Sequence, residues 1–138
     1  MNPTIKAILG VVAAGITTFV VIAFSELAMG TVYPAPHIDP TDVAAINAYL
    51  SSAPWHMFVL LAVSHLLATT AAGWVGTRIT GKITTAITIG IVFMVFAGQN
   101  IYYYDGHPGW FWISLIVYPL GAYIGFLFAS KRAEAVKS

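Results

Sequence analysis

The chain has 138 residues, of which 59% are hydrophobic and only 8% are charged. Soluble domains carry about 25% charged residues, so this composition excludes an ordinary soluble enzyme. The net charge of +1 gives no sign of nucleic-acid binding, and the absence of cysteine excludes disulfides, thiolate metal sites and cysteine nucleophiles. Apolar runs of about 20 residues, the length that a bilayer requires, predict an all-α, polytopic membrane protein with one domain, residues 1–138.

The first apolar run predicts a membrane span over about 4–29. Its apolar stretch from Ala7 to Phe24 is longer than the 7 to about 15 residues of a signal-peptide core, so we expect a retained span. Gly30 suits the left-handed residue that ends many helices. Small side chains recur along this span at helical spacing and predict a helix-packing face: Gly10, Ala14, Thr17, Val21 and Ser25.

The first external loop, residues 31–53, predicts a short helix of its own. Its prolines favour an extended start over 32–36. Asp39 followed by Pro40 then resembles a helix N-cap and first helical position, with Asp42 near the positive end of the helix dipole. The predicted helix, about 40–50, is too short to span a bilayer, so we expect it to lie along the outer membrane surface.

Three further spans are predicted over about 54–76, 83–104 and 108–130, with aromatic residues near their outer ends. Pro119 lies inside the last span and removes a hydrogen bond to the carbonyl of Leu115, which predicts a kink. Gly121 and Gly125 form a GxxxG pattern that is typical of close helix packing. The fold class is therefore a bundle of four transmembrane helices with a short interfacial helix in the first loop.

The charges of the chain predict its topology. All Lys and Arg residues fall on one side of the four-span arrangement: Lys6, Arg78, Lys82, Lys131, Arg132 and Lys137. Cationic loops stay on the cytoplasmic side, so both termini are predicted to be cytoplasmic, in a bacterial inner membrane. The same bias opposes the dual topology of antiparallel exporter dimers.

The opposite side carries acidic and histidine residues and is the predicted location of any site. Glu26 lies about one turn from the outer end of the first span, where an ionised carboxylate is costly and needs a partner. It either reaches the head groups and bonds a loop amide, or belongs to a ligand, ion or proton site. Depth places the candidate binding residues in one outer layer: Glu26, Tyr33, His37, His56, Gln99, Asn100, Asp105 and His107.

Histidine spacing limits metal chemistry. His56 and His65 are nine residues apart and point in opposite directions on a helix, so they cannot bind one metal or one haem together. We expect His65 to be a core histidine that hydrogen-bonds across helices. Glu26, His56 and His107 are the weak candidates for a metal site, because no HExxH pattern or paired histidine supports them. His107 is of a residue type that titrates near physiological pH, and no cofactor is predicted.

Several short motifs resemble an uncharacterised family of small bacterial membrane proteins with four helices. They are Glu26, the segment 33–36, Asp39, the segment 73–75 with Arg78, and the segment 107–112. Ala35 stands where the family pattern has a further proline. The resemblance implies the four-helix architecture and a bacterial origin, and it implies no activity.

The function predicted from these features is binding of a small molecule or ion at the outer polar cluster. Two alternatives remain: a structural or assembly subunit of a membrane complex, and a small proton-coupled transporter. The small-residue helix faces also predict a homo-oligomer. Membrane lipids are the predicted partners of the chain. An enzymatic activity is disfavoured because the sequence contains no catalytic motif.

Overall fold

The computed structural model describes residues 2–34 and 36–135, and their fold is all-helical. Four helical segments of this part are long and apolar enough to cross a membrane: Pro3–Val32, Trp55–Thr80, Ile83–Tyr103 and Gly109–Lys131. The prediction of four membrane-spanning helices with a short helix between the first two is therefore confirmed. Ala35 of the resemblance and Lys137 of the cationic set lie outside the described residues, as does the side chain of Arg132.

Helix α1 (Pro3–Val32) extends farther than predicted at its C-terminal end. Its start is capped by Asn2, whose side chain accepts a 2.8 Å hydrogen bond from the Thr4 amide. Its end lies where the Tyr33 amide bonds the carbonyl of Met29, so the predicted end at Gly30 is wrong. Gly30 stays helical, whereas the one described residue with positive φ is Gly81 (φ 72°), which ends the helix Trp55–Thr80 in the left-handed conformation.

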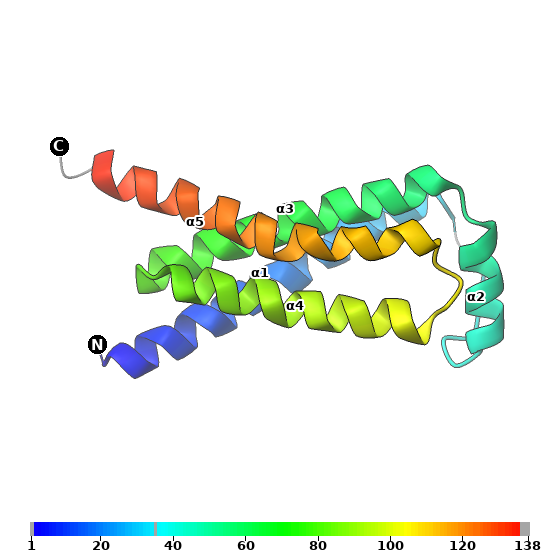
Figure 1. The fold of residues 1–138 in the computed structure, drawn as a ribbon, viewed down its shortest axis with the longest axis horizontal. Helices are drawn as coiled ribbons and strands as arrows, with labels where there is room; N and C mark the ends of the chain where they lie inside the picture. The colour runs from blue at the N-terminus through cyan, green and yellow to red at the C-terminus, as the bar shows by residue number, and fades with distance from the viewer. Residues whose placement is uncertain (1, 35, 136–138) are drawn as a thin grey trace.

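Helix α2 (Val43–Ser52) begins three residues after the predicted start. Asp42 is the N-cap and accepts a 2.9 Å hydrogen bond from the Ala45 amide, so the prediction of Asp39 as N-cap is wrong. Asp39 lies in a turn instead. There its carboxyl group accepts hydrogen bonds from the hydroxyl group and from the amide of Thr41, and these two bonds, the first having the larger effect, lower the pKa of the carboxyl group. Helix α2 lies across one end of the bundle, and the first turn of α1 and the last described turn of the chain lie at the other end (Figure 1). These are called the α2 end and the terminal end below.

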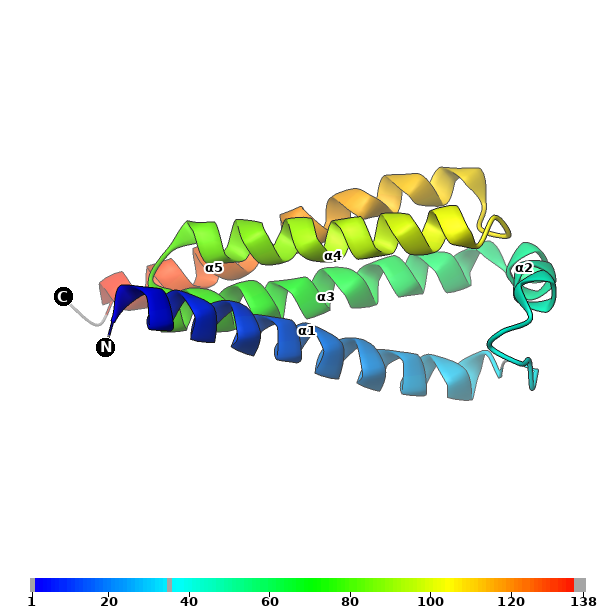
Figure 2. The same cartoon turned by 90° about the horizontal axis from the view of Figure 1, so that it is seen from below.

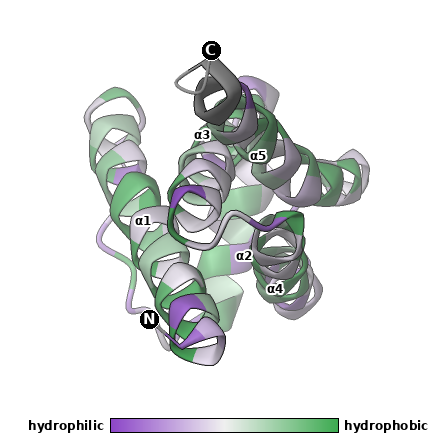
Figure 3. Ribbon diagram, turned by 90° about the vertical axis from the view of Figure 1, so that its left-hand side faces the viewer, coloured by the Kyte–Doolittle hydropathy of each residue, from purple (hydrophilic) through white to green (hydrophobic). Residues whose placement is uncertain are grey.

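Helix α3 (Trp55–Thr80) is the centre of the bundle. It packs most extensively on α5 (Val117–Ala135) and α1, and also contacts α4 (Ile83–Tyr103). Seen along the bundle axis, the helices are coloured mostly as hydrophobic, with hydrophilic residues only in places (Figure 3). Large apolar side chains such as Leu27 and Ile113 are mostly exposed, as expected for helices surrounded by lipid.

The fourth span departs from α geometry before Pro119. Residues Gly109–Ile116 form the 3₁₀ helix η1, and the α-helix begins only at Val117. Proline has no amide hydrogen and its ring crowds the carbonyl four residues before it, which disfavours α-helical bonding on that side. The sequence predicted a kink at Pro119, and the structure has a 3₁₀ helix of eight residues, nearly three turns, just before it.

Glycines set the closest helix contacts. A Cβ atom at Gly73 would collide with the backbone of Ala122, and one at Gly125 would collide with the carbonyl of Thr70. Gly121 likewise lies against Thr69 and Leu66, so both glycines of the predicted GxxxG pattern pack on α3 of the same chain.

Candidate functional site

The α2 half of the bundle contains a cavity of about 370 Å³, called the α1–α4 cavity here. Its walls are mostly aromatic and aliphatic, and five helical elements (α1, α3, α4, η1 and α5) and one loop contribute to them. The lining residues are Phe19, Ile22, Glu26, Leu61, His65, Phe93, Phe96, Ala97, Asn100, Ile101, His107, Phe111 and Tyr118.

The cavity has a buried floor and an exposed rim. Phe93 and Tyr118 are buried, at 7% and 4% exposure. Phe19 on α1 and Phe96 on α4 are 63% and 57% exposed, and Glu26 and Asn100 are also exposed. The cavity therefore opens sideways between α1 and α4. These two helices make far fewer contacts than α1 makes with α3, and they draw apart toward the α2 end (Figure 2).

A hydrogen bond between α3 and α5 forms part of the floor. The hydroxyl group of Tyr118 lies 2.7 Å from Nδ1 of His65, and the two rings are 5.3 Å apart. The predicted cross-helix hydrogen bond of His65 is thus confirmed. Neither residue was among the predicted site residues, yet both line the same cavity as Glu26.

His107 lies between two cavities. Its Nδ1 donates a 2.7 Å hydrogen bond to the carbonyl of Tyr104, because a carbonyl oxygen can only accept. In the neutral ring Nε2 is then an acceptor. The ring is stacked on Phe111 at 5.3 Å and meets Phe58 edge to face at 5.9 Å.

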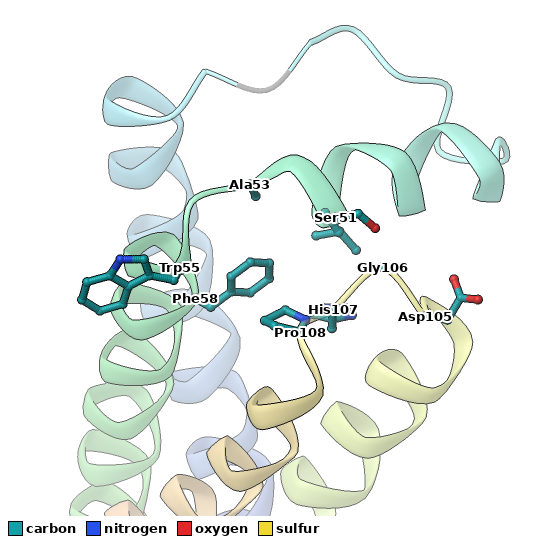
Figure 4. A pocket seen from close by; sticks show the side chains of 9 residues that line it. Ser51, Ala53, Trp55, Phe58, Asp105, Gly106, His107 and Pro108 are labelled. Atoms are coloured by element: carbon teal, nitrogen blue, oxygen red, sulfur yellow. The ribbon is translucent and has the colours of Figure 1, made fainter.

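The second cavity, of about 320 Å³, lies beneath α2. Asp105, Gly106 and His107 form its loop side, and Phe58 forms part of the α3 side (Figure 4). His107 lines this cavity as well as the α1–α4 cavity. The three rings of Phe58, His107 and Phe111, which contact one another, therefore separate a polar loop cavity from a membrane-facing one.

Glu26 has no hydrogen bond or ion pair to any other residue that the structure describes. The interpretation in which it bonds a loop amide is not realised among residues 2–34 and 36–135. The described cations, such as Lys6, belong to the terminal end of the bundle. Lys6 is 20 residues away on the same helix, which is about 30 Å along the axis.

The eight predicted site residues separate into three groups. Glu26, Asn100 and His107 line the α1–α4 cavity, and Asp105 lines the second cavity together with His107. Tyr33 and His56 contact each other, with ring centroids 5.5 Å apart, away from both cavities. His37 and Gln99 are exposed and line neither. Tyr33 and His37, which were predicted to lie in the same outer layer as Glu26, therefore do not line the cavity with it.

A metal centre is not assembled in the described part of the chain. No group of three or more His, Asp or Glu side chains there could hold a metal ion. Of the three weak metal candidates, Glu26 and His107 share a cavity, and His56 faces elsewhere. This follows from the half-turn between His56 and His65, since His65 is the histidine of α3 that faces the cavity.

Comparisons with protein-family models, with curated proteins and with solved structures found no match to the chain. The resemblance to a bacterial four-helix family therefore stays a prediction. Inference about function rests on the two cavities and on the side chains that line them.

Proposed function

We propose that this membrane protein binds a small amphiphilic molecule in the α1–α4 cavity. One observation carries the proposal: five polar side chains converge on an aromatic cavity that opens sideways. They are Glu26, His65, Asn100, His107 and Tyr118. Ligand sites in proteins typically have volumes of about 300–1,000 Å³ and apolar walls with a few convergent polar groups, and a volume of about 370 Å³ falls within that range.

The polar groups lie at two depths. Asn100 is three residues from the end of α4, about 4.5 Å along the axis, whereas His65 is ten residues into α3, about 15 Å. Aromatic rings, including Phe93 and Phe111, lie among them. A ligand with a polar head and an apolar body suits this arrangement, because the head finds hydrogen-bond partners while the body contacts rings or extends into lipid.

The membrane is proposed to be a bacterial inner membrane, with both termini in the cytoplasm. The described cations Lys6, Arg78, Lys82 and Lys131 support this orientation through the preference of basic residues for the cytoplasmic side. The cavity then lies in the outer half of the membrane, and the ligand enters between α1 and α4 from the outer leaflet.

Transport and assembly receive less support. A transport site must be reached from both sides, but below the His65–Tyr118 pair the helices meet through close contacts of Gly73, Gly121 and Gly125. Those glycines also pack inside the chain, so a homo-oligomer would have to form on other faces. Binding is therefore the function that the cavity supports best.

Photolabelling tests the proposal. A decanol probe that carries a diazirine group is incubated with the purified protein in nanodiscs, irradiated, and the labelled peptides are identified by mass spectrometry. We expect labelling of the α4 segment 93–101 and of 111–118. Ala97→Phe fills the cavity and should remove most of this labelling, because Ala97 lines it. Ala23→Phe, at an exposed position of α1 outside the cavity, is the matched control. Equal labelling of these peptides in wild type and Ala97→Phe would overturn the proposal.

A further inference from the structure

We infer that the ligand of the α1–α4 cavity is an organic cation, an amphiphile whose ammonium head group pairs with the carboxylate of Glu26. This inference rests on the proposed binding function and adds the charge of the ligand. Three features of the cavity support it: an unpaired carboxylate, aromatic walls, and the absence of Lys and Arg from the described lining.

The carboxylate lacks a counter-ion. Glu26 lies six residues before the end of α1, about 9 Å along the axis. An acidic side chain costs about 2.5–3.5 kcal/mol at the centre of a membrane helix, and less toward the surface, unless it is paired. Since no described residue pairs with Glu26, a positively charged ligand would supply the missing partner.

The walls suit an ammonium group. Phe19, Phe93, Phe96 and Phe111 line the cavity, and Phe19 meets Phe93 edge to face at 5.3 Å. The faces of aromatic rings attract cations within about 6 Å, more strongly when water is excluded. Aromatic rings beside one carboxylate form a chemistry that recognises substituted ammonium ions.

The remaining polar groups are compatible with a cation. The side-chain oxygen of Asn100 and Nε2 of neutral His107 are acceptors for N–H groups. An anionic head group would instead face Glu26 with no Lys or Arg side chain in the described lining to offset the repulsion. A neutral head group would bind but leave the carboxylate unpaired.

Three probes that differ only in the head group test this inference. Each has the same diazirine-bearing decyl chain, and the head group is trimethylammonium, hydroxyl or carboxylate. With the full chain in nanodiscs of neutral lipid, we expect the ammonium probe to label the cavity peptides about tenfold more than the alcohol, a difference of about 1.4 kcal/mol in binding, and the carboxylate probe to label them least.

Variants assign the preference to one side chain. Glu26→Gln should remove the preference for ammonium over alcohol while alcohol labelling persists, and Glu26→Asp should retain part of it. Asp105→Asn removes a carboxylate at the same end of the bundle but outside the α1–α4 cavity, so it should leave the preference unchanged. Gel filtration and circular dichroism check that each variant is folded.

The outcomes separate the two proposals. Cavity labelling by the alcohol without a preference for ammonium, or a preference that survives Glu26→Gln, overturns the cationic ligand and leaves amphiphile binding intact. A preference lost in Asp105→Asn as fully as in Glu26→Gln also overturns it, because the charge of the whole end would then be responsible. Failure of all three probes to label the cavity peptides of the wild type removes both proposals.

Discussion

The two halves of the bundle are held together differently. In the terminal half and the middle, small residues bring backbones into contact, as at Gly10, Gly76 and Gly125. In the α2 half, rings meet rings, as where Phe58 lies 5.3 Å from Phe111. Glycine contacts leave no free volume, whereas planar rings joined at their edges leave gaps between them. The terminal half is therefore closely packed, whereas the α2 half contains the cavity that could hold a ligand.

The polar groups follow the same division, except for the buried hydroxyl group of Thr77 in the terminal half, which has no hydrogen-bond partner among the described residues. In the terminal half, the hydroxyl groups of Thr80 and Thr85 bond each other at 2.9 Å across the turn between α3 and α4. In the α2 half, Glu26 has no described partner, and His107 bonds a carbonyl through only one ring nitrogen. Because lipid offers no hydrophobic drive for helix association, we expect the terminal half to supply most of the stability.

The largest effect is expected from a side chain placed in a glycine contact. Gly125→Leu forces a Cβ atom against the carbonyl of Thr70 and the amide of Trp74, neither of which can move alone. Overpacking of this kind costs about 1–3 kcal/mol or more. Thermal unfolding in detergent should show a large loss. Gly15→Leu, where a Cβ meets no atom within 4 Å, is the control, and equal losses in the two variants would contradict the comparison.

A local effect is expected at the α2 end. Gly106, in the loop after α4, lies directly against Asn47 of α2, and its amide donates a hydrogen bond to the Asn47 side chain. A Cβ atom at Gly106 would collide with the backbone of Asn47. Gly106→Val should therefore release α2 and raise hydrogen exchange over 43–52, while the unfolding temperature of the bundle changes little. Global unfolding of this variant would show that α2 contributes to the stability of the whole bundle.

A smaller effect is expected at the floor of the cavity. Tyr118→Phe removes the hydrogen bond to His65, and such bonds between membrane helices contribute about 0.6 kcal/mol on average. A double-mutant cycle with His65→Leu in unfolding experiments measures the coupling. A coupling energy near zero would mean that the 2.7 Å contact contributes nothing to stability.

The smallest effect on stability is expected at Glu26. Glu26→Gln removes an unpaired carboxylate at an exposed position, so the free energy of unfolding should stay within about 0.5 kcal/mol of wild type and change toward greater stability. Chemical unfolding in mixed micelles provides the measurement. A clear loss of stability would indicate that Glu26 has a structural partner, which would weaken its assignment to a ligand.

The spans could be predicted from the sequence because their length and apolarity are nearly sufficient to define them. The helix ends could not be predicted as well. Asp39 and Asp42 both have a carboxylate that could cap the helix. In the structure Asp39 accepts a hydrogen bond from the Thr41 amide within a turn, and Asp42 caps the helix by accepting one from the Ala45 amide. Gly30 had a suitable residue type, but the chain continues as a helix through it.

The sequence predicted the depth of the site residues in the membrane, but not the direction in which their side chains face. Counting residues from the span ends placed Glu26, Asn100 and His107 in one layer, and they line one cavity. The same count also placed His56 in this layer, since depth does not show which faces of separate helices converge. His65 was predicted to be a core histidine and Tyr118 was not among the predicted site residues, because nothing in the sequence near them indicated that a cavity extends to them.

The central claim is that an amphiphile binds in the α2 half and not over the whole lipid-facing surface. Mapping the sites labelled by the photoreactive decyl ammonium probe in nanodiscs tests this most directly. The account predicts labels concentrated on residues 93–101 and 111–118, competed by excess non-photoreactive decyltrimethylammonium. Labels spread evenly over exposed positions of the terminal half, such as Ile8 and Val12, with no competition, would contradict it.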